Sequence, residues 1–408
     1  MFLSGGVCLV RNVYFLFFVI LSFVNVKLPL FDLTSKRLSA AFLLYFALLG
    51  IGGRIRLSYS ALFFMVFLTY IVLFFSINNS GGASYQFMAM YFSWFVALLV
   101  GIGLFAFRPS MSELHVAVKY AVPVLFILII SNFISELGVK ALIPWEFRAA
   151  IKMSDISINS TFNQVVVLVV WSYYFSQFMQ TSKSKWLLVS ISVVMSLYVL
   201  SSLSRQNILS LAVFFFLIVI LSINLRFSFY FALISLLSWV VLDQNGLVSK
   251  ILFRFQKSID QVASGDYSRI SQFVDSFRAS LDQPLYGLGL GGFRDYALSL
   301  GYYEHTAVPE STYNQVSAEG GIVFFLVFVF GLASIGARYM YGYITSSDPN
   351  VKKLAGFALS YFFMLLFMML FNEVHFSTSF SVVLLVFLYF LTGSRKNGIY
   401  SSRASGRL

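Results

Sequence analysis

The chain has 408 residues, of which 59% are hydrophobic and 11% are charged, and its formal net charge is +12. A water-soluble domain cannot bury so much apolar surface, and repeated uncharged stretches of about 20 residues are typical of membrane-spanning helices. The continuous apolar runs also exclude a membrane β-barrel, in which apolar and polar residues alternate. The sequence therefore predicts an all-α, polytopic integral membrane protein.

The first apolar run follows Arg11, and no small-residue cleavage site follows it, so we expect an uncleaved anchor. The single cysteine, Cys8, excludes an internal disulfide and thiolate chemistry elsewhere in the chain. About 12 transmembrane helices are expected in one transmembrane domain over residues 1–408. The predicted segments are 13–31, 38–53, 59–77, 86–107, 114–134, 161–180, 186–203, 207–224, 227–242, 320–337, 354–371 and 378–393.

The basic residues are distributed unevenly between the two sides of these segments. With the N-terminus inside, the inner connections and both termini carry 15 Lys and Arg residues, whereas the short outer connections carry four, Lys27, Lys36, Arg37 and Arg205. This bias follows the positive-inside rule and predicts cytoplasmic termini. It also explains the basic excess without nucleic acid as a partner.

Two outer connections are too long to be simple turns. The first covers residues 135–160. The second covers residues 243–319 and contains nine of the 16 acidic residues and six bases. Within it, apolar residues recur at helical spacing until Pro284, which predicts an amphipathic helix on the outer membrane surface or over the helical bundle. The residues at this spacing are Ile270, Phe273, Val274, Phe277 and Leu281.

Three arginines are candidates for binding an anionic group. Arg205, in SLSRQN, is the only charge between Trp186 and Leu225, and it lies in a tight hairpin on the outer side, against the positive-inside bias. Charges at membrane depth are usually functional, although an arginine at a helix end also extends to the interface for solvation alone. Arg254 and Arg269 have the planar guanidinium that suits a diphosphate, but the spacing alone slightly favours solvated loop charges.

Other motifs give little support for a cofactor. Gly287, Gly289 and Gly292 match GxGxxG, but no βαβ unit surrounds them, so a turn is favoured over a dinucleotide site. The three histidines are scattered, which argues against a metal centre. No internal repeat or inverted pair of broken helices is evident, and this weakens a carrier hypothesis.

Glu310 and Glu319 flank the start of the apolar segment that follows residue 320. Ser311 is expected to cap the helix, with Glu310 complementing its positive end. Glu319 lies where the apolar run begins, where a carboxylate is harder to attribute to structure alone. If one regular helix carried both carboxylates, they would point to opposite faces and would not form a pair.

Four stretches resemble the bacterial O-antigen polymerase and ligase superfamily. They are STFNQVVVL (160–168), SLSRQNILSL (202–211), SRISQFVDSFRASLDQPLYGLGLGGF (268–293) and ESTYNQVSAEGGIVFFL (310–326). The resemblance implies a metal-independent glycosyltransferase without a cofactor. Its donor would be an oligosaccharide linked to undecaprenyl diphosphate, used at the periplasmic face of the inner membrane.

The resemblance also implies residue roles. Arg205 and Arg254 or Arg269 would bind the diphosphate, and Glu310 would be the base that deprotonates the acceptor hydroxyl. His305 is an alternative base. Substrate-binding roles fall on Asn163, Arg278, Tyr313, Glu319 and His305. A chain-length regulator and a flippase of the same pathway are the expected protein partners.

One departure from the family pattern bears on the activity. Members that act as ligases typically carry His-Asn where this chain has Glu310-Ser311. The difference favours a polymerase, which joins the growing polymer to the next lipid-linked repeat unit. The alternatives are a ligase that transfers polymer to the lipid A core and, from a different class, a flippase or other transporter of lipid-linked sugars. The nearly uncharged helices and the charged outer loops favour an enzyme over a transporter.

Overall fold

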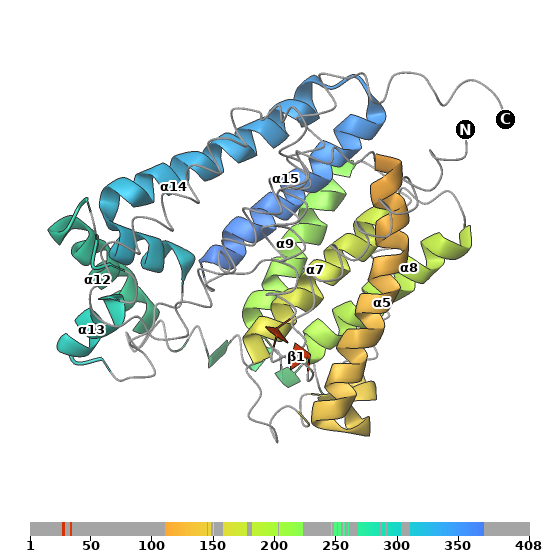
Figure 1. Ribbon diagram of the computed structural model, residues 1–408, viewed down its shortest axis with the longest axis horizontal. Helices are drawn as coiled ribbons and strands as arrows, with labels where there is room; N and C mark the ends of the chain where they lie inside the picture. The colour runs from red at the N-terminus through yellow and green to blue at the C-terminus, as the bar shows by residue number, and fades with distance from the viewer. Residues whose placement is uncertain are drawn as a thin grey trace. The chain divides into compact units, whose positions relative to one another are not determined.

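The computed structural model describes residues 27–28, 33–34, 111–144, 146–147, 150, 158–177, 182–202, 204–222, 268–285, 287–289, 292–302 and 311–370, together with scattered positions between 246 and 260. These residues are helical apart from their connections and a two-residue antiparallel ladder, β1 (Lys27–Leu28) with β2 (Leu33–Thr34). The structure thus confirms an all-helical architecture for the part of the chain that it describes (Figure 1).

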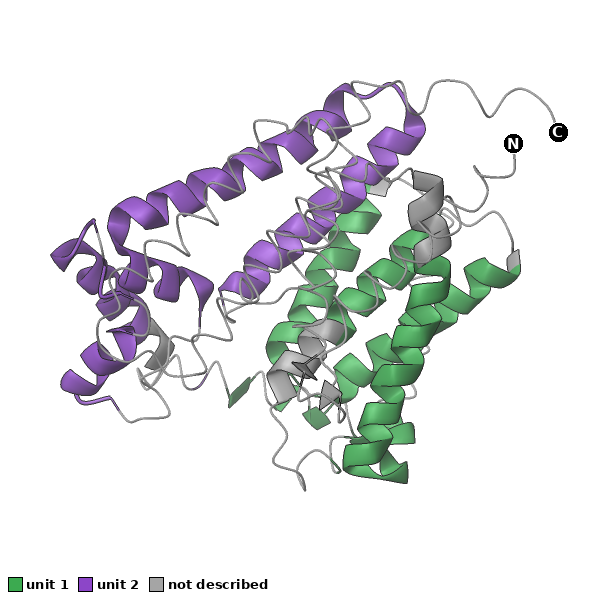
Figure 2. Ribbon diagram, in the orientation of Figure 1, with its two compact units in different colours: residues 1–46, 107–259 green, residues 47–106, 260–408 purple. Residues whose placement is uncertain are grey.

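The chain divides into two compact units (Figure 2). One comprises residues 1–46 and 107–259, and the other comprises residues 47–106 and 260–408. The described helices of the first unit are α5, α7, α8 and α9, and those of the second are α12, α13, α14 and α15.

In the first unit, α5 (Met111–Leu137) packs on α7 (Ile158–Ser176) and α8 (Ser182–Ser201). The short connection before α8 makes α7 and α8 an antiparallel hairpin, and α9 (Arg205–Ser222) returns along both. The 3-10 helix η1 (Val139–Leu142) is fixed to α8, because the Tyr198 hydroxyl donates a 2.6 Å hydrogen bond to the carbonyl of Ala141. Part of the predicted outer loop 135–160 is therefore packed on the helices.

In the second unit, α14 (Thr312–Thr345) and α15 (Pro349–Met369) form the long hairpin. Asp348 caps α15 by accepting a 2.8 Å hydrogen bond from the backbone N–H of Asn350, and Pro349 occupies the first helical position, where no N–H is needed. The shorter helices α12 (Ser268–Asp282) and α13 (Gly292–Ser299) precede this hairpin, and α12 packs chiefly on α14.

Four described helices contain stretches long and apolar enough to cross a membrane: Val118–Leu137, Lys183–Ser201, Thr312–Thr345 and Pro349–Met369. On α14 the large apolar side chains alternate between a buried face (Phe324, Phe328, Leu332, Ile335) and an exposed face (Val323, Leu326, Val327, Phe330). A helix with apolar residues on its exposed side is suited to lipid and not to water. These helices are consistent with a membrane protein.

Six of the twelve predicted segments, 114–134, 161–180, 186–203, 207–224, 320–337 and 354–371, fall on α5, α7, α8, α9, α14 and α15. The segments predicted at 38–53, 59–77, 86–107, 227–242 and 378–393 lie outside the described residues, as does most of 13–31. Lys27 and Leu28, at the end of 13–31, form β1, so the helix predicted there does not reach residue 31. Pro29 accounts for this limit, because a residue before proline disfavours the helical conformation. The segment predicted at 320–337 is longer at both ends.

Candidate functional site

The first part of α14 begins with a side-chain cap. Ser311 has an extended backbone (φ −131°, ψ 140°), and its hydroxyl accepts a 3.2 Å hydrogen bond from the N–H of Asn314. This confirms the predicted cap and places the helix start at Thr312. Glu310 therefore precedes the helix in the sequence, and the condition under which the two carboxylates would point to opposite faces, one regular helix carrying both, is not met.

Residues 312–320 form a polar half-helix whose side chains are buried. Asn314, Gln315, Ser317 and Glu319 are all at most 5% exposed. The Gln315 amide donates a 3.2 Å hydrogen bond to the Glu319 carboxylate, one turn along the helix. Among the described residues, no hydrogen-bond partner lies within reach of the side-chain oxygen of Asn314 or of Gln315. Buried polar atoms without a partner are uncommon in proteins, and they mark this half-helix as a candidate for binding a polar ligand.

Gly321 interrupts α14 at the end of the polar half-helix. Its φ of 75° and ψ of 171° are not helical, and only glycine adopts this conformation readily. The stretch 322–345 that follows is about 36 Å long at 1.5 Å per residue, enough to cross a hydrocarbon core of about 30 Å. The break therefore separates a buried polar segment from an apolar, membrane-length one.

A turn of the chain packs directly on this break, backbone against backbone. The N–H groups of Leu288 and Gly289 donate to the carbonyls of Ala318 and Glu319, at 2.9 and 3.1 Å, and the N–H of Val323 donates to the carbonyl of Pro284 at 3.2 Å. A Cβ atom at Gly321 would lie 2.6 Å from the carbonyl oxygen of Pro284.

Two glycines on the other side of this contact also have a positive φ. Gly287 has a φ of 59°, and a Cβ atom there would overlap the backbone of Glu319 and Gly321. Gly289 has a φ of 76°. Gly287 and Gly289 thus belong to a turn, as predicted, and hydrogen bonds from this turn hold the end of the polar half-helix.

Helix α12 contributes a second polar surface. Its buried side chains are small or polar: Gln272, Ser276, Ala279 and Ser280. Ala279 and Ala318 belong to one buried cluster with Phe293 and Ala297 of α13, so the polar half-helix of α14 lies against α12. Arg269 is the second residue of α12.

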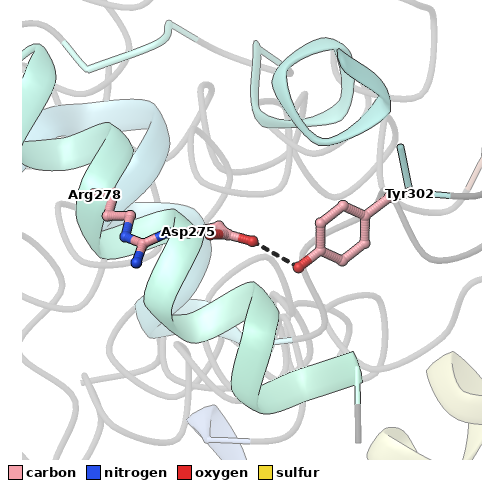
Figure 3. A network of polar contacts seen from close by, with 3 residues as sticks. All are labelled: Asp275, Arg278 and Tyr302. Atoms are coloured by element: carbon pink, nitrogen blue, oxygen red, sulfur yellow. Dashed lines mark hydrogen bonds and ion pairs between the residues drawn. The ribbon is translucent and has the colours of Figure 1, made fainter. Parts of the chain in front are cut away.

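The solvent-facing edge of α12 carries a small polar network (Figure 3). The Tyr302 hydroxyl donates a 2.7 Å hydrogen bond to Asp275, which also pairs with Arg278 at 3.5 Å. Burial and the hydrogen bond to the Asp275 carboxylate raise the pKa of Tyr302 to about 12. The Arg278 side chain is 68% exposed, so its described contact is structural and points away from the buried polar half-helix.

The first unit holds the other cluster. Arg205 begins α9 and is half-buried, and Asn207, two residues later, is fully buried. Among the described residues, no partner lies within hydrogen-bond distance of either polar atom of the Asn207 carboxamide. The buried side chains nearby in sequence are also polar: Ser201, Ser202 and Ser210.

The helical hairpins bring Arg205 and Asn163 to the same end of the first unit. The Ser192 hydroxyl of α8 donates a hydrogen bond to the carbonyl of Val169 in α7, and Tyr173 of α7 makes edge-to-face contacts with Phe214 and Phe215 of α9. Because the chain reverses between α7 and α8 and again between α8 and α9, α7 and α9 run in the same direction, and the Tyr173 contacts give their register. Asn163 and Arg205, each in the first part of its helix, therefore occupy positions at one end of that helix pair.

The remaining predicted site residues are distributed as follows. Tyr313 lies at the start of α14, half-buried, and its hydroxyl donates a 3.3 Å hydrogen bond to the carbonyl of Leu366 in α15. Arg254, His305 and Glu310 lie outside the described residues. Within the described part of the chain, no three His, Cys, Asp or Glu side chains gather in a way that could hold a metal ion.

Three polar residues were not singled out from the sequence: Asn207, Asn314 and Gln315. Each lies inside a motif that had been noted for a neighbouring charge, in SLSRQN and ESTYNQ. A carboxamide beside an apolar run could have indicated them, because a polar side chain there is costly to bury without a hydrogen-bond partner.

A comparison with protein-family models found no match for this chain, and a search of the curated proteins found none either.

Proposed function

We propose that the protein is a glycan polymerase that joins undecaprenyl-diphosphate-linked repeat units at the outer face of the inner membrane. In the reaction, an acceptor sugar hydroxyl attacks the anomeric carbon of the donor. The bond from that carbon to the diphosphate oxygen breaks as the new glycosidic bond forms. The hydroxyl proton passes to a base, and the undecaprenyl diphosphate leaves as an anion.

The observation that carries the proposal is the polar half-helix of residues 312–320. It buries Asn314, Gln315 and Glu319 immediately before an apolar helix of membrane length. A lipid-linked sugar requires this combination, because its polar head must be bound while its carrier remains in lipid. A purely structural helix entry would gain nothing from burying two amide oxygens that have no described partner.

The roles of individual residues in this proposal follow from their chemistry. Glu310, which precedes the cap of α14 in the sequence, is the proposed base, and Glu319 and His305 are the alternatives. Arg205 and Arg254 or Arg269 bind the diphosphate, since a planar guanidinium forms two parallel hydrogen bonds with phosphate oxygens. In this proposal, Asn207 and Asn163 bind hydroxyl or phosphate oxygens of the substrate.

A second candidate function is transport of the same lipid-linked sugar, and one observation favours it. The break at Gly321, next to the buried Glu319, resembles the discontinuous helices at which transporters bind substrates. The described residues show one such break, whereas transporters usually carry related breaks in two repeats. The ligase alternative is disfavoured by Glu310-Ser311 in place of His-Asn.

The decisive experiment compares products in a deletion strain and with the purified protein. A polymerase deletion should leave a single repeat unit on the lipopolysaccharide core and remove all longer chains, whereas loss of every repeat indicates a ligase or a flippase. Purified protein in nanodiscs should convert lipid-linked repeat units into polymer and release undecaprenyl diphosphate. Movement of the substrate across liposomes without any polymer would overturn the proposal in favour of transport.

A further inference from the structure

Helix α12 is amphipathic, but its apolar side is exposed, which is not expected of a helix on the surface of a water-soluble protein. Its large apolar side chains, Phe273, Val274, Phe277 and Leu281, are 41–55% exposed, whereas its buried side chains are small or polar. A surface helix of a soluble protein has the opposite arrangement, with the apolar side facing the core.

The side chains of α12 divide into three separate sectors at 100° per residue. Measured from Phe277, the exposed apolar residues cover about −40° to +60° and the buried residues about −160° to −60°. The third sector, at about +100° to +160°, is polar; it contains the exposed Ser271, Arg278 and Asp282 and the half-buried Asp275. A helix that contacts protein, water and one further, apolar phase needs these three sectors.

The helix on which α12 packs, α14, indicates which apolar environment contacts the exposed apolar sector of α12. The turn after α12 is bonded to the break in α14, and the exposed apolar stripe of α14 (Val323, Leu326, Val327, Phe330) begins immediately after that break. After α12, the chain continues through Leu285, which is 56% exposed, into the turn that is bonded to α14. This turn holds α12 at the start of the membrane-length part of α14.

We infer that α12 lies in the surface of the lipid bilayer, with Phe273, Val274, Phe277 and Leu281 inserted at the boundary between headgroups and acyl chains. Amphipathic helices of this kind lie in the interface plane with the apolar side buried about 5–10 Å deep. The polar edge of α12 has two acidic residues, Asp275 and Asp282, and one basic residue, Arg278. Its insertion therefore depends on apolar contact and not on attraction to anionic lipids. The inference is independent of the proposed glycosyl transfer.

The test is a spin-label scan of the full-length protein. Cys8, the only native cysteine, is first replaced by serine, and single cysteines are then introduced from Ser271 to Asp282. The labelled proteins are reconstituted in phosphatidylcholine vesicles. At each position, collision of the label with oxygen, which is enriched in lipid, is compared with collision with a water-soluble nickel chelate. Phe273, Phe277 and Leu281 are the test positions, and Ser271, Arg278 and Asp282 are matched exposed controls.

The inference predicts that oxygen accessibility exceeds nickel accessibility several-fold at the three test positions, and that the order reverses at the three controls. Adding phosphatidylglycerol should leave the pattern unchanged. The periodicity over the whole helix is scored, so the loss of one variant does not remove the result.

Two outcomes would overturn the inference. Nickel dominating at all positions would place the apolar sector in water. Low accessibility to both reagents at the test positions would place protein over it. In the second case, spin–spin broadening that disappears on dilution with unlabelled protein would identify a second copy as the occupant, and persistent protection would identify another segment of the same chain.

Discussion

The contact between Gly321 and the turn after α12 makes a quantitative prediction for alanine substitution. At Gly321, alanine would have to adopt φ 75° and ψ 171°, at a cost of about 1–3 kcal/mol. Its Cβ atom would also lie 2.6 Å from the carbonyl oxygen of Pro284 and 2.7 Å from that of Gln283. These are backbone atoms that cannot rotate away, and such overpacking costs about a further 1–3 kcal/mol. The expected loss of stability for Gly321→Ala is therefore about 2–6 kcal/mol.

Gly289→Ala is the matched control. Gly289 has nearly the same φ, 76°, but nothing lies within 4 Å of a Cβ atom there. Its substitution should cost only the backbone term, about 1–2 kcal/mol. The assay is unfolding of the purified protein in mixed micelles with increasing SDS, followed by tryptophan fluorescence. If Gly321→Ala is no more destabilising than Gly289→Ala, the two segments are not packed backbone against backbone, and the reasoning fails.

Three further predictions concern the candidate site and the edge of α12. Arg205→Ala should abolish polymer without lowering protein levels, and Arg205→Lys should recover little; a normal lipopolysaccharide ladder with lysine would show that a simple positive charge is sufficient. Glu310→Gln should collapse the ladder to a single repeat unit if Glu310 is the base, since a positioned base contributes about 10²–10⁴-fold; long chains that persist in Glu310→Gln but disappear in Glu319→Gln would transfer that role to Glu319. Tyr302→Phe should destabilise the protein by about 1–3 kcal/mol at neutral pH by removing the bond to Asp275, and unfolding that matches the wild type would contradict that bond.

The contribution of Tyr302 to the stability of the folded protein depends on pH. Folding raises the pKa of this phenol from its ordinary value of 10.0 to about 12, so the folded state favours the protonated form. The stabilisation is therefore complete below pH 10 and is lost as the pH rises through about 12. The difference between wild type and Tyr302→Phe should narrow over that interval in the same unfolding assay.

The existence of the described helices follows from the sequence more readily than their contacts do. Apolar runs predicted membrane-length segments, and helical spacing ending at Pro284 predicted a helix where α12 is found, because both signals are local. The direction in which α12 packs was not predictable in the same way. Spacing shows that Phe273 and Phe277 share a face, but only the structure, in which Gln272 and Ser276 are buried, shows that this face is the exposed one.

The candidate site was predicted only in part. The charges were found from the sequence because a carboxylate or guanidinium beside an apolar run is conspicuous, as with Arg205 and Glu319. The buried amides Asn207 and Asn314 were missed, since their burial depends on how helices pack. The break at Gly321 was also not predictable. Glycine is common in membrane helices, and here the helix is interrupted where it bonds to a segment about 35 residues earlier in the chain.

The backbone contact at the break has a consequence for how this protein can be recombined with others. Segments joined by main-chain hydrogen bonds and by glycines that admit no Cβ atom must match in backbone path, whatever the side chains around them. A chimera with a crossover between residues 289 and 318 would combine a turn from one parent with a broken helix from another. Exchanging residues 283–323 as a single cassette keeps both sides of this backbone contact together.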